Sequence, residues 1–247
     1  MGDRVAIVTG ASSGLGRAVA RKLAGADMRL CLVDRDAGGL AETAAMIGGA
    51  GESALLHQVD LSGAEACKRL VSATVDHFGR LDALCNIAGV IHMADTPDMP
   101  LDLYEQTLAV NLSAPFILSQ AAIPHLLENN GAIVNVASSA AFIGEAYAAA
   151  YCASKWGLVG MTKAMAMEFV KQPIRINAVA PGGMMTNIAA NMQFPKDADV
   201  ELIRRYSGLR GLVEVDDVAD MVCMLAGDAG RGFHGACINI DAGITAG

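Results

Sequence analysis

The feature that most constrains this chain is the regular alternation of short apolar runs with longer segments of helical periodicity. The strand-like runs are residues 4–10, 28–34, 53–62, 81–89, 131–139, 173–183 and 235–243. A chain that alternates in this way folds as a parallel sheet with helices on both faces. We therefore predict an α/β, doubly wound, seven-stranded parallel sheet in one domain over residues 1–247, with a lid at about 184–210.

Composition narrows the class of protein. Of 247 residues, 53% are hydrophobic and 18% charged, so a large core is expected. The net charge is −8 without a basic block, which argues against nucleic acid and anionic membranes as partners. A secretory segment at the start and a run of 18 apolar residues are both absent, so a cytoplasmic protein is expected. The six cysteines form no C-x-x-C pair and the five histidines show no ligand spacing, which predicts reduced thiols and no metal site.

A glycine-rich turn joins the first predicted strand to the first helix. Gly10, Gly14 and Gly16 stand there, in a spacing that differs from the standard G-x-G-x-x-G pattern. A strand, turn and helix in this order aim backbone N–H groups and a helix N-terminus at a phosphate. The turn therefore favours a dinucleotide, although a glycine-rich turn alone can also be a plain tight turn.

The end of the second predicted strand bears on the choice of cofactor. Asp34 lies eighteen residues after Gly16, where an acidic side chain hydrogen-bonds a ribose diol and repels a 2′-phosphate. Arg35 is the counter-argument, because an arginine there can accept a 2′-phosphate. We predict NAD, with NADP as the alternative. Asp34 could also simply cap the helix that begins near Ala37.

Other candidate residues fall at the ends of further predicted strands. They are Asp60, Asn86 to Gly89, Ser138 and Pro181. Because right-handed crossovers bring the carboxyl ends of parallel strands to one edge, we expect all of them along that edge, where ligands bind in open α/β sheets. This convergence is stronger evidence than any one motif.

Ser138, Tyr151 and Lys155 carry the predicted chemistry. Tyr151 and Lys155 are four apart in a helical run, so they share one helix face, and Ser138 ends the preceding apolar run. Lowering a tyrosine pKa from about 10 to about 7 takes roughly 4 kcal/mol, which one cation about 4 Å away supplies only where water is largely excluded. We therefore expect a partly dry pocket, in which a second positive charge such as an oxidised nicotinamide would help. A Y-x-x-x-K pair alone can also be an ordinary surface pair.

Asn111 is out of place in the apolar run AVNLSAPFIL, inside a predicted long helix or broken pair of helices over residues 100–130. A buried polar group needs partners, so Asn111 is either a structural bridge or part of a proton path.

Together these motifs resemble those of the short-chain dehydrogenase/reductase family over nearly the whole chain. The matching segments are Thr9 to Gly16, Asp60, Asn86-x-Ala88-Gly89, Asn111, Ser138, Tyr151-x-x-x-Lys155, and Pro181-Gly182 with Thr186. The resemblance implies a Rossmann-type fold, a homotetramer, and a catalytic set of Asn111, Ser138, Tyr151 and Lys155. In that set Tyr151 is the acid or base, Lys155 lowers its pKa and holds the nicotinamide ribose, and Asn111 anchors a relay water. One position departs: the family commonly has a second Asn where Ile87 stands here.

The resemblance also implies a set of cofactor contacts. The expected residues are Gly10, Ser12, Ser13, Gly14, Leu15, Gly16, Asp34, Arg35, Asp60, Leu61, Asn86, Ala88, Gly89, Tyr151, Lys155, Pro181, Gly182, Met184 and Thr186. Among these, Gly14 and Gly16 would line the pyrophosphate, and Thr186 would contact the nicotinamide carboxamide.

The predicted activity is hydride transfer between nicotinamide and a secondary alcohol or ketone. Apolar residues in the lid and after Gly89, such as Met184, Ile188, Val90 and Ile91, suggest an apolar substrate, unless they only pack the lid. Two alternatives remain. One is an NADPH-dependent ketoreductase of the 3-oxoacyl-carrier type, and the other is a nucleotide-sensing protein of the same fold without turnover.

Overall fold

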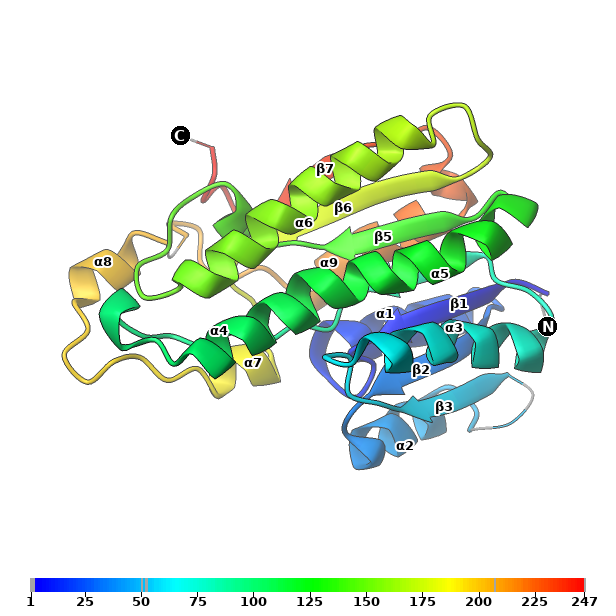
Figure 1. Cartoon of the computed structure of the whole chain (residues 1–247), viewed down its shortest axis with the longest axis horizontal. Helices are drawn as coiled ribbons and strands as arrows, with labels where there is room; N and C mark the ends of the chain where they lie inside the picture. The colour runs from blue at the N-terminus through cyan, green and yellow to red at the C-terminus, as the bar shows by residue number, and fades with distance from the viewer. Residues whose placement is uncertain (1–2, 50, 52, 207, 247) are drawn as a thin grey trace.

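The computed structural model describes residues 3–49, 51, 53–206 and 208–246, and it contains one seven-stranded parallel sheet. The strand order is β3-β2-β1-β4-β5-β6-β7 (Figure 1). The bounds are β1 Val5–Thr9, β2 Arg29–Asp34, β3 Ala54–Gln58, β4 Ala83–Asn86, β5 Ala132–Val136, β6 Arg175–Pro181 and β7 Cys237–Ile240. The predicted doubly wound sheet is confirmed. The strands are shorter than the apolar runs because the outer residues of the runs lie in the connections at one or both ends of the strands.

Helices cover both faces of the sheet. Alternate side chains of a strand point to opposite faces, so Ala6 and Val8 pack under one layer while Val5 and Ile7 pack under the other. The first layer holds α1 (Gly14–Gly25), α2 (Ala37–Met46) and α9 (Val215–Ala226). The second holds α3 (Ala64–Phe78), α5 (Ala114–Glu128) and α6 (Ala149–Glu168), which lie in front of the sheet in Figure 1.

The predicted helix over residues 100–130 is one continuous rod with a change of type in the middle. It begins as α4 (Leu101–Leu108), widens into the π-helical turn η2 (Ala109–Ser113), and continues as α5. Such π turns are frequent at functional sites. Here the wide turn contains Asn111, which is buried.

The predicted lid region contains two short helices, α7 (Asn187–Ala190) and α8 (Val200–Arg204). Both lie beyond the carboxyl ends of the strands, at the left of Figure 1, whereas the N-terminus lies at the opposite edge. Within the predicted lid, Ser207 falls outside the described residues, as do residues 1–2, 50, 52 and 247 of the predicted domain.

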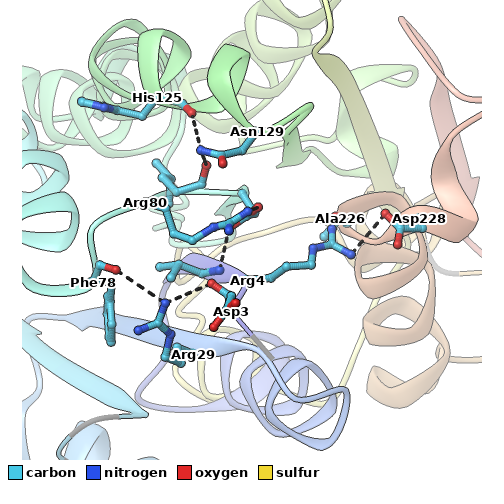
Figure 2. Close-up of polar contacts among 12 residues, drawn as sticks. Asp3, Arg4, Arg29, Phe78, Arg80, His125, Asn129, Ala226 and Asp228 are labelled. Carbon is cyan, nitrogen blue, oxygen red and sulfur yellow. Dashed lines mark hydrogen bonds and ion pairs between the residues drawn. The ribbon is translucent and has the colours of Figure 1, made fainter. Parts of the chain in front are cut away.

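Charged side chains tie together the amino ends of the strands (Figure 2). Asp82 is buried, and its carboxylate accepts hydrogen bonds from Arg80 Nη2 (2.7 Å), Arg80 Nε (2.9 Å) and the Val5 N–H (2.8 Å). Arg29 donates to the carbonyl of Asp3 (3.0 Å). The sequence analysis did not identify this network, which joins segments far apart in the chain.

Candidate active site

The turn after β1 and the start of α1 line a cavity. Gly10 and Gly14 have φ values of +70° and +48°, which glycine adopts without strain. A Cβ at Gly16 would lie 2.0 Å from the Gly10 carbonyl oxygen, so only glycine lets α1 pack this closely on the turn. Ser13, the N-cap of α1, makes no side-chain cap hydrogen bond among the described residues, and the first turn holds no acidic residue. The start of α1 therefore suits an anionic group.

Asp34 is fixed at the end of β2. Its carboxylate accepts hydrogen bonds from the N–H groups of Ser12 (3.3 Å) and Asp36 (3.1 Å). The alternative that Asp34 caps the next helix is wrong, because Asp36 is the N-cap of α2 and accepts from the Gly39 N–H. Arg35 is exposed and borders the same cavity. The start of α1 and the anchored carboxylate fit a dinucleotide, whose phosphates suit a helix N-terminus and whose ribose hydroxyls need an acceptor.

One cavity of about 550 Å³ runs along the carboxyl edge of the sheet and has the size of a ligand pocket. Most of the predicted site residues line it. They are Gly10, Ser12, Ser13, Gly14, Leu15, Gly16, Asp34, Arg35, Asp60, Leu61, Ala88, Gly89, Ser138, Tyr151, Lys155, Pro181, Gly182, Met184 and Thr186. Asn86 and Asn111 are not among the lining residues.

Asn86 is placed behind the cavity wall. It is buried, its side-chain amide donates to Asn135 Oδ1 (2.8 Å), and its own Oδ1 has no partner among the described residues. The backbone beyond it is held by Thr9, whose hydroxyl oxygen accepts from the N–H groups of Ile87 (2.9 Å) and Ala88 (3.0 Å). Ile87 is 9% exposed, belongs to the core cluster on the face of the sheet that α1 covers, and also borders the cavity.

Asn111 and Lys155 meet behind Gly89. A Cβ at Gly89 would lie 3.4 Å from Asn111 Oδ1 and 3.7 Å from Lys155 Nζ. Asn111 exchanges two hydrogen bonds of 2.8 Å with the backbone of Val90 and donates to Ser154 Oγ (3.1 Å). Asn111 is therefore a structural bridge between η2, α6 and the loop after β4. The water-anchoring role stays a prediction.

Tyr151 and Lys155 lie together as their spacing predicts. Both are in the first turns of α6, with Lys155 Nζ 5.6 Å from the centre of the Tyr151 ring. Lys155 is buried and donates to the Val136 carbonyl (2.8 Å) at the end of β5. Ser138 follows β5 as the N-cap of η3 (Ser139–Ala141), and its hydroxyl lies near enough to Tyr151 to oppose the rise of the tyrosine pKa.

Burial dominates the protonation of this pair in the protein alone. It raises the pKa of Tyr151 to about 12, opposed by the hydrogen bond with Ser138 and reinforced by the charges of Glu145 and Cys152. It lowers the pKa of Lys155 to about 8. The partly dry pocket stays a prediction, and in the protein alone Lys155 does not bring the tyrosine pKa below 10. To act as an acid or base near pH 7, Tyr151 therefore needs its pKa lowered from about 12, not from the free value of about 10.

The sequence analysis missed several lining residues. His92, on the loop after β4, shares a hydrogen bond of 3.1 Å between its Nε2 and Gln106 Oε1 on α4, and both border the cavity. Asn187 and Asn191 border it from α7. No pattern in the sequence singled out Gln106, which lines the cavity together with Val110, four residues on. The apolar residues expected near the substrate, Met184, Ile188, Val90 and Ile91, all line the cavity, although Ile188 is also exposed to solvent.

Comparisons with known proteins match this geometry. The profile of the family described as short chain dehydrogenase matches residues 4–196. The D-threitol dehydrogenase of Mycolicibacterium smegmatis is 35% identical, over 98% of this chain and 93% of its own length. The 2,5-dichloro-2,5-cyclohexadiene-1,4-diol dehydrogenase of Sphingobium indicum is 33% identical, over 100% of this chain and 98% of its own length.

A solved structure is also similar. The 3-ketoacyl-(acyl-carrier-protein) reductase of Brucella melitensis, complexed with NADH, superposes with a TM-score of 0.87 at 28% identity, covering 98% of each chain. The likeness in sequence and in overall fold extends over nearly the whole chain. This chain belongs to the short-chain dehydrogenase family, and it is an oxidoreductase that uses a nicotinamide cofactor on CH–OH groups.

Proposed function

We propose that this protein is an NAD(H)-dependent dehydrogenase that interconverts a secondary alcohol and its ketone. The observation that carries the proposal is one cavity that joins the anchored Asp34 carboxylate to the Ser138–Tyr151–Lys155 group. A bound nicotinamide would accept or supply the hydride. The residues of this chain would position the substrate and exchange its proton.

Tyr151 is the proposed acid–base residue. Its side chain lines the cavity together with Ser138, which would stabilise charge on the substrate oxygen. Lys155 would hold the nicotinamide ribose and favour the phenolate by its charge. Asn111 would act from behind Gly89, through the backbone of Val90, with a relay water as its proposed partner.

The proposed cofactor is NAD rather than NADP. The Asp34 carboxylate is held by two backbone N–H groups, so it cannot turn away from a 2′-phosphate without losing them. Titrating NADH and NADPH against the protein by fluorescence tests this. Tighter NADH binding is expected, and Asp34→Ser should narrow the difference. Tighter NADPH binding in the wild type would assign the dominant contact to Arg35 instead.

The proposed substrate is a small alcohol with an apolar skeleton, and the region over residues 184–210 is the proposed lid. Met184, Ile188, Val90 and Ile91 on the cavity wall support both parts of this proposal. A panel of secondary alcohols with NAD, followed by the absorbance of NADH, tests it. Turnover of compact alcohols is expected. NADH binding without turnover of any alcohol would favour the nucleotide-sensing alternative.

A second candidate is an NADPH-dependent ketoreductase. The likeness to a 3-ketoacyl-(acyl-carrier-protein) reductase favours it, although that structure contains NADH. Assays of a 3-oxoacyl thioester with each reduced cofactor separate the two functions. Faster turnover with NADPH than with NADH would favour the reductase.

We also propose a cytoplasmic homotetramer. Large apolar side chains are exposed on the rod and on α6, among them Tyr104, Phe116, Trp156 and Met167, and such a surface suits a subunit contact. Among the described residues, the helix Leu101–Glu128 is long and apolar enough to cross a membrane, which is weak evidence because core helices of globular proteins pass the same test. Light scattering on the purified protein gives the subunit number.

A further inference from the structure

The two residues after Gly10, Ala11 and Ser12, are held to the end of β2 by their N–H groups. The Ala11 N–H donates to the Val33 carbonyl (3.1 Å), and the Ser12 N–H donates to Asp34 Oδ2 (3.3 Å). Ser12 and Asp34 both line the cavity. The bond between them is one of the two that fix the Asp34 carboxylate, on which the proposed choice of NAD rests.

Arg17 on α1 and Thr43 on α2 hold the carbonyl groups of the same two residues. Arg17 Nη2 donates to the Ser12 carbonyl, and Arg17 Nε donates to the Thr43 hydroxyl oxygen (2.9 Å). The Thr43 hydroxyl lies 2.8 Å from the Ala11 carbonyl oxygen and 3.0 Å from the Gly39 carbonyl oxygen, so its one proton serves one of them at a time. All four backbone polar groups of Ala11 and Ser12 therefore have partners.

These contacts lie in tightly packed surroundings behind the cavity wall. Thr43 is 0% exposed. A Cβ at Gly39 would lie 2.7 Å from Ser12 Cβ and 2.8 Å from the Ser12 carbonyl oxygen, so the first turn of α2 packs directly against the glycine-rich turn. Neither Arg17 nor Thr43 is among the described residues that line the cavity. They can therefore affect a cofactor there only through the turn.

The geometry of the peptide bond connects Thr43 to Asp34. The C=O and N–H groups of a planar trans peptide unit point in opposite directions. The Ala11 carbonyl and the Ser12 N–H belong to one such unit, which Thr43 holds on one side and Asp34 on the other. If Thr43 released the carbonyl, the unit could rotate. The Asp34 carboxylate would then lose one of the two N–H donors that direct it.

We propose that Arg17 and Thr43 are positioning residues that set the selectivity for NAD over NADP. They orient the peptide unit between Ala11 and Ser12 so that its N–H holds the Asp34 carboxylate toward the ribose diol. The inference rests on the proposed NAD-dependent function and deepens it. Loss of either side chain should weaken the binding of NADH more than that of NADPH. A carboxylate that can turn accepts less well from the diol and is less firmly opposed to a 2′-phosphate.

The test compares Thr43→Val, which removes the hydroxyl at nearly constant volume, with Thr43→Ser, which keeps it. Thr74→Val is the matched control, because Thr74 is also 0% exposed and its hydroxyl donates to the Leu70 carbonyl within α3 (2.9 Å). The Kd values of NADH and NADPH are measured by fluorescence titration. Thr43→Val should lower the ratio of the NADPH Kd to the NADH Kd by about 3- to 10-fold, the effect of one lost hydrogen bond. Thr43→Ser and Thr74→Val should leave the ratio unchanged.

Arg17→Met gives a second measurement that does not alter the buried threonine. It removes the donors to Ser12 and Thr43, so the same ratio should fall. Arg21→Met, one turn later on the exposed side of α1, is its control and should leave the ratio unchanged. An unchanged ratio in Thr43→Val overturns the inference. If Thr43→Val does not fold, an unchanged ratio in Arg17→Met overturns it instead.

A double-mutant cycle separates positioning from a general effect on the fold. In Asp34→Ser the carboxylate through which Thr43 acts is absent, so adding Thr43→Val should not change the ratio further. An equal fall in both backgrounds would reject the proposal. Because binding is measured without turnover, failure of the proposed function is seen separately. If the wild type binds NADPH more tightly than NADH, the choice of NAD fails, whereas a fall in the ratio that requires Asp34 still supports the positioning role.

Discussion

The two edges of the sheet treat buried charge in opposite ways. At the amino edge, the buried Asp82 carboxylate is fully paired with Arg80 and the backbone of Val5. At the carboxyl edge, Lys155 is buried against a single carbonyl oxygen, and the Glu145 carboxyl has no protein partner among the described residues. The difference teaches that the amino edge holds the fold together, while the carboxyl edge keeps charged groups available for ligands at a cost in stability.

The largest expected effect lies at the carboxyl edge, in activity. Tyr151→Phe removes the hydroxyl that exchanges the substrate proton, so turnover should fall by about three orders of magnitude or more. NADH affinity and thermal stability should stay close to those of the wild type. Steady-state kinetics with a good alcohol substrate measures the change. Turnover comparable to the wild type would remove Tyr151 from the acid–base role.

The next effect lies at the amino edge, in stability. Asp82→Asn leaves Arg80 without its partner and should lower the free energy of unfolding by about 3 kcal/mol. Urea unfolding at pH 7 measures the loss, and Asp228→Asn, on the exposed side of an ion pair with Arg4, is the control. Turnover per folded molecule should be unchanged, since Asp82 lies at the edge away from the cavity. A loss of turnover without a loss of stability would contradict the division between the edges.

Lys155→Met should raise the free energy of unfolding, whereas most substitutions of buried residues lower it. The pKa of Lys155 falls from 10.5 to about 8 on burial, so at pH 7 the folded state holds an unfavourable charge that the variant lacks. We expect the variant to be about 1–2 kcal/mol more stable at pH 7, after allowing for the lost bond to Val136, and much less active. Between pH 8 and 10.5 the unfolded wild type binds more protons than the folded one, so wild-type stability rises with pH there and the gain shrinks. A gain that does not depend on pH would point to packing instead.

The smallest effect is expected for the exposed part of the amino-edge network. Arg4 pairs with Asp228, whose side chain is 90% exposed. Arg4→Gln should therefore change the free energy of unfolding by less than about 1 kcal/mol. The same urea experiment measures it, and adding salt should reduce the difference further. A change as large as that of Asp82→Asn would mean that the network acts as one unit.

Much of the architecture could be predicted because it depends on local patterns. Each apolar run became one strand, and the glycines before α1 and the Tyr151–Lys155 spacing fixed local geometry without distant partners. The convergence of strand ends at one edge follows from the handedness of crossovers. For the same reason most predicted cofactor residues line the cavity.

What escaped prediction depends on contacts between distant residues. The Asn86 side chain turns to Asn135, 49 residues away, and Asp82 reaches the backbone of Val5, 77 residues away. The raised pKa of Tyr151 comes from its burial in the folded protein, so it could not be inferred from the spacing of Tyr151 and Lys155. The capping role of Asp36 rather than Asp34 was open because both stand before the same helix.

The π-helical turn at Ala109–Ser113 bears on which changes in length this protein can tolerate. A π turn holds one residue more than a regular helix would use there, and each residue of an α-helix advances it by about 100°. Because the wide turn absorbs its extra residue locally, loss of one residue near Leu112 would restore a regular rod and leave α4 nearly in phase with α5. Gln106 could then stay beside His92, whereas Asn111 would be drawn out of its place behind Gly89. Loss of one residue within the regular part of α5 would instead rotate the segments on either side by about 100° relative to each other, so the π turn is the one place in this rod where a change of length acts locally.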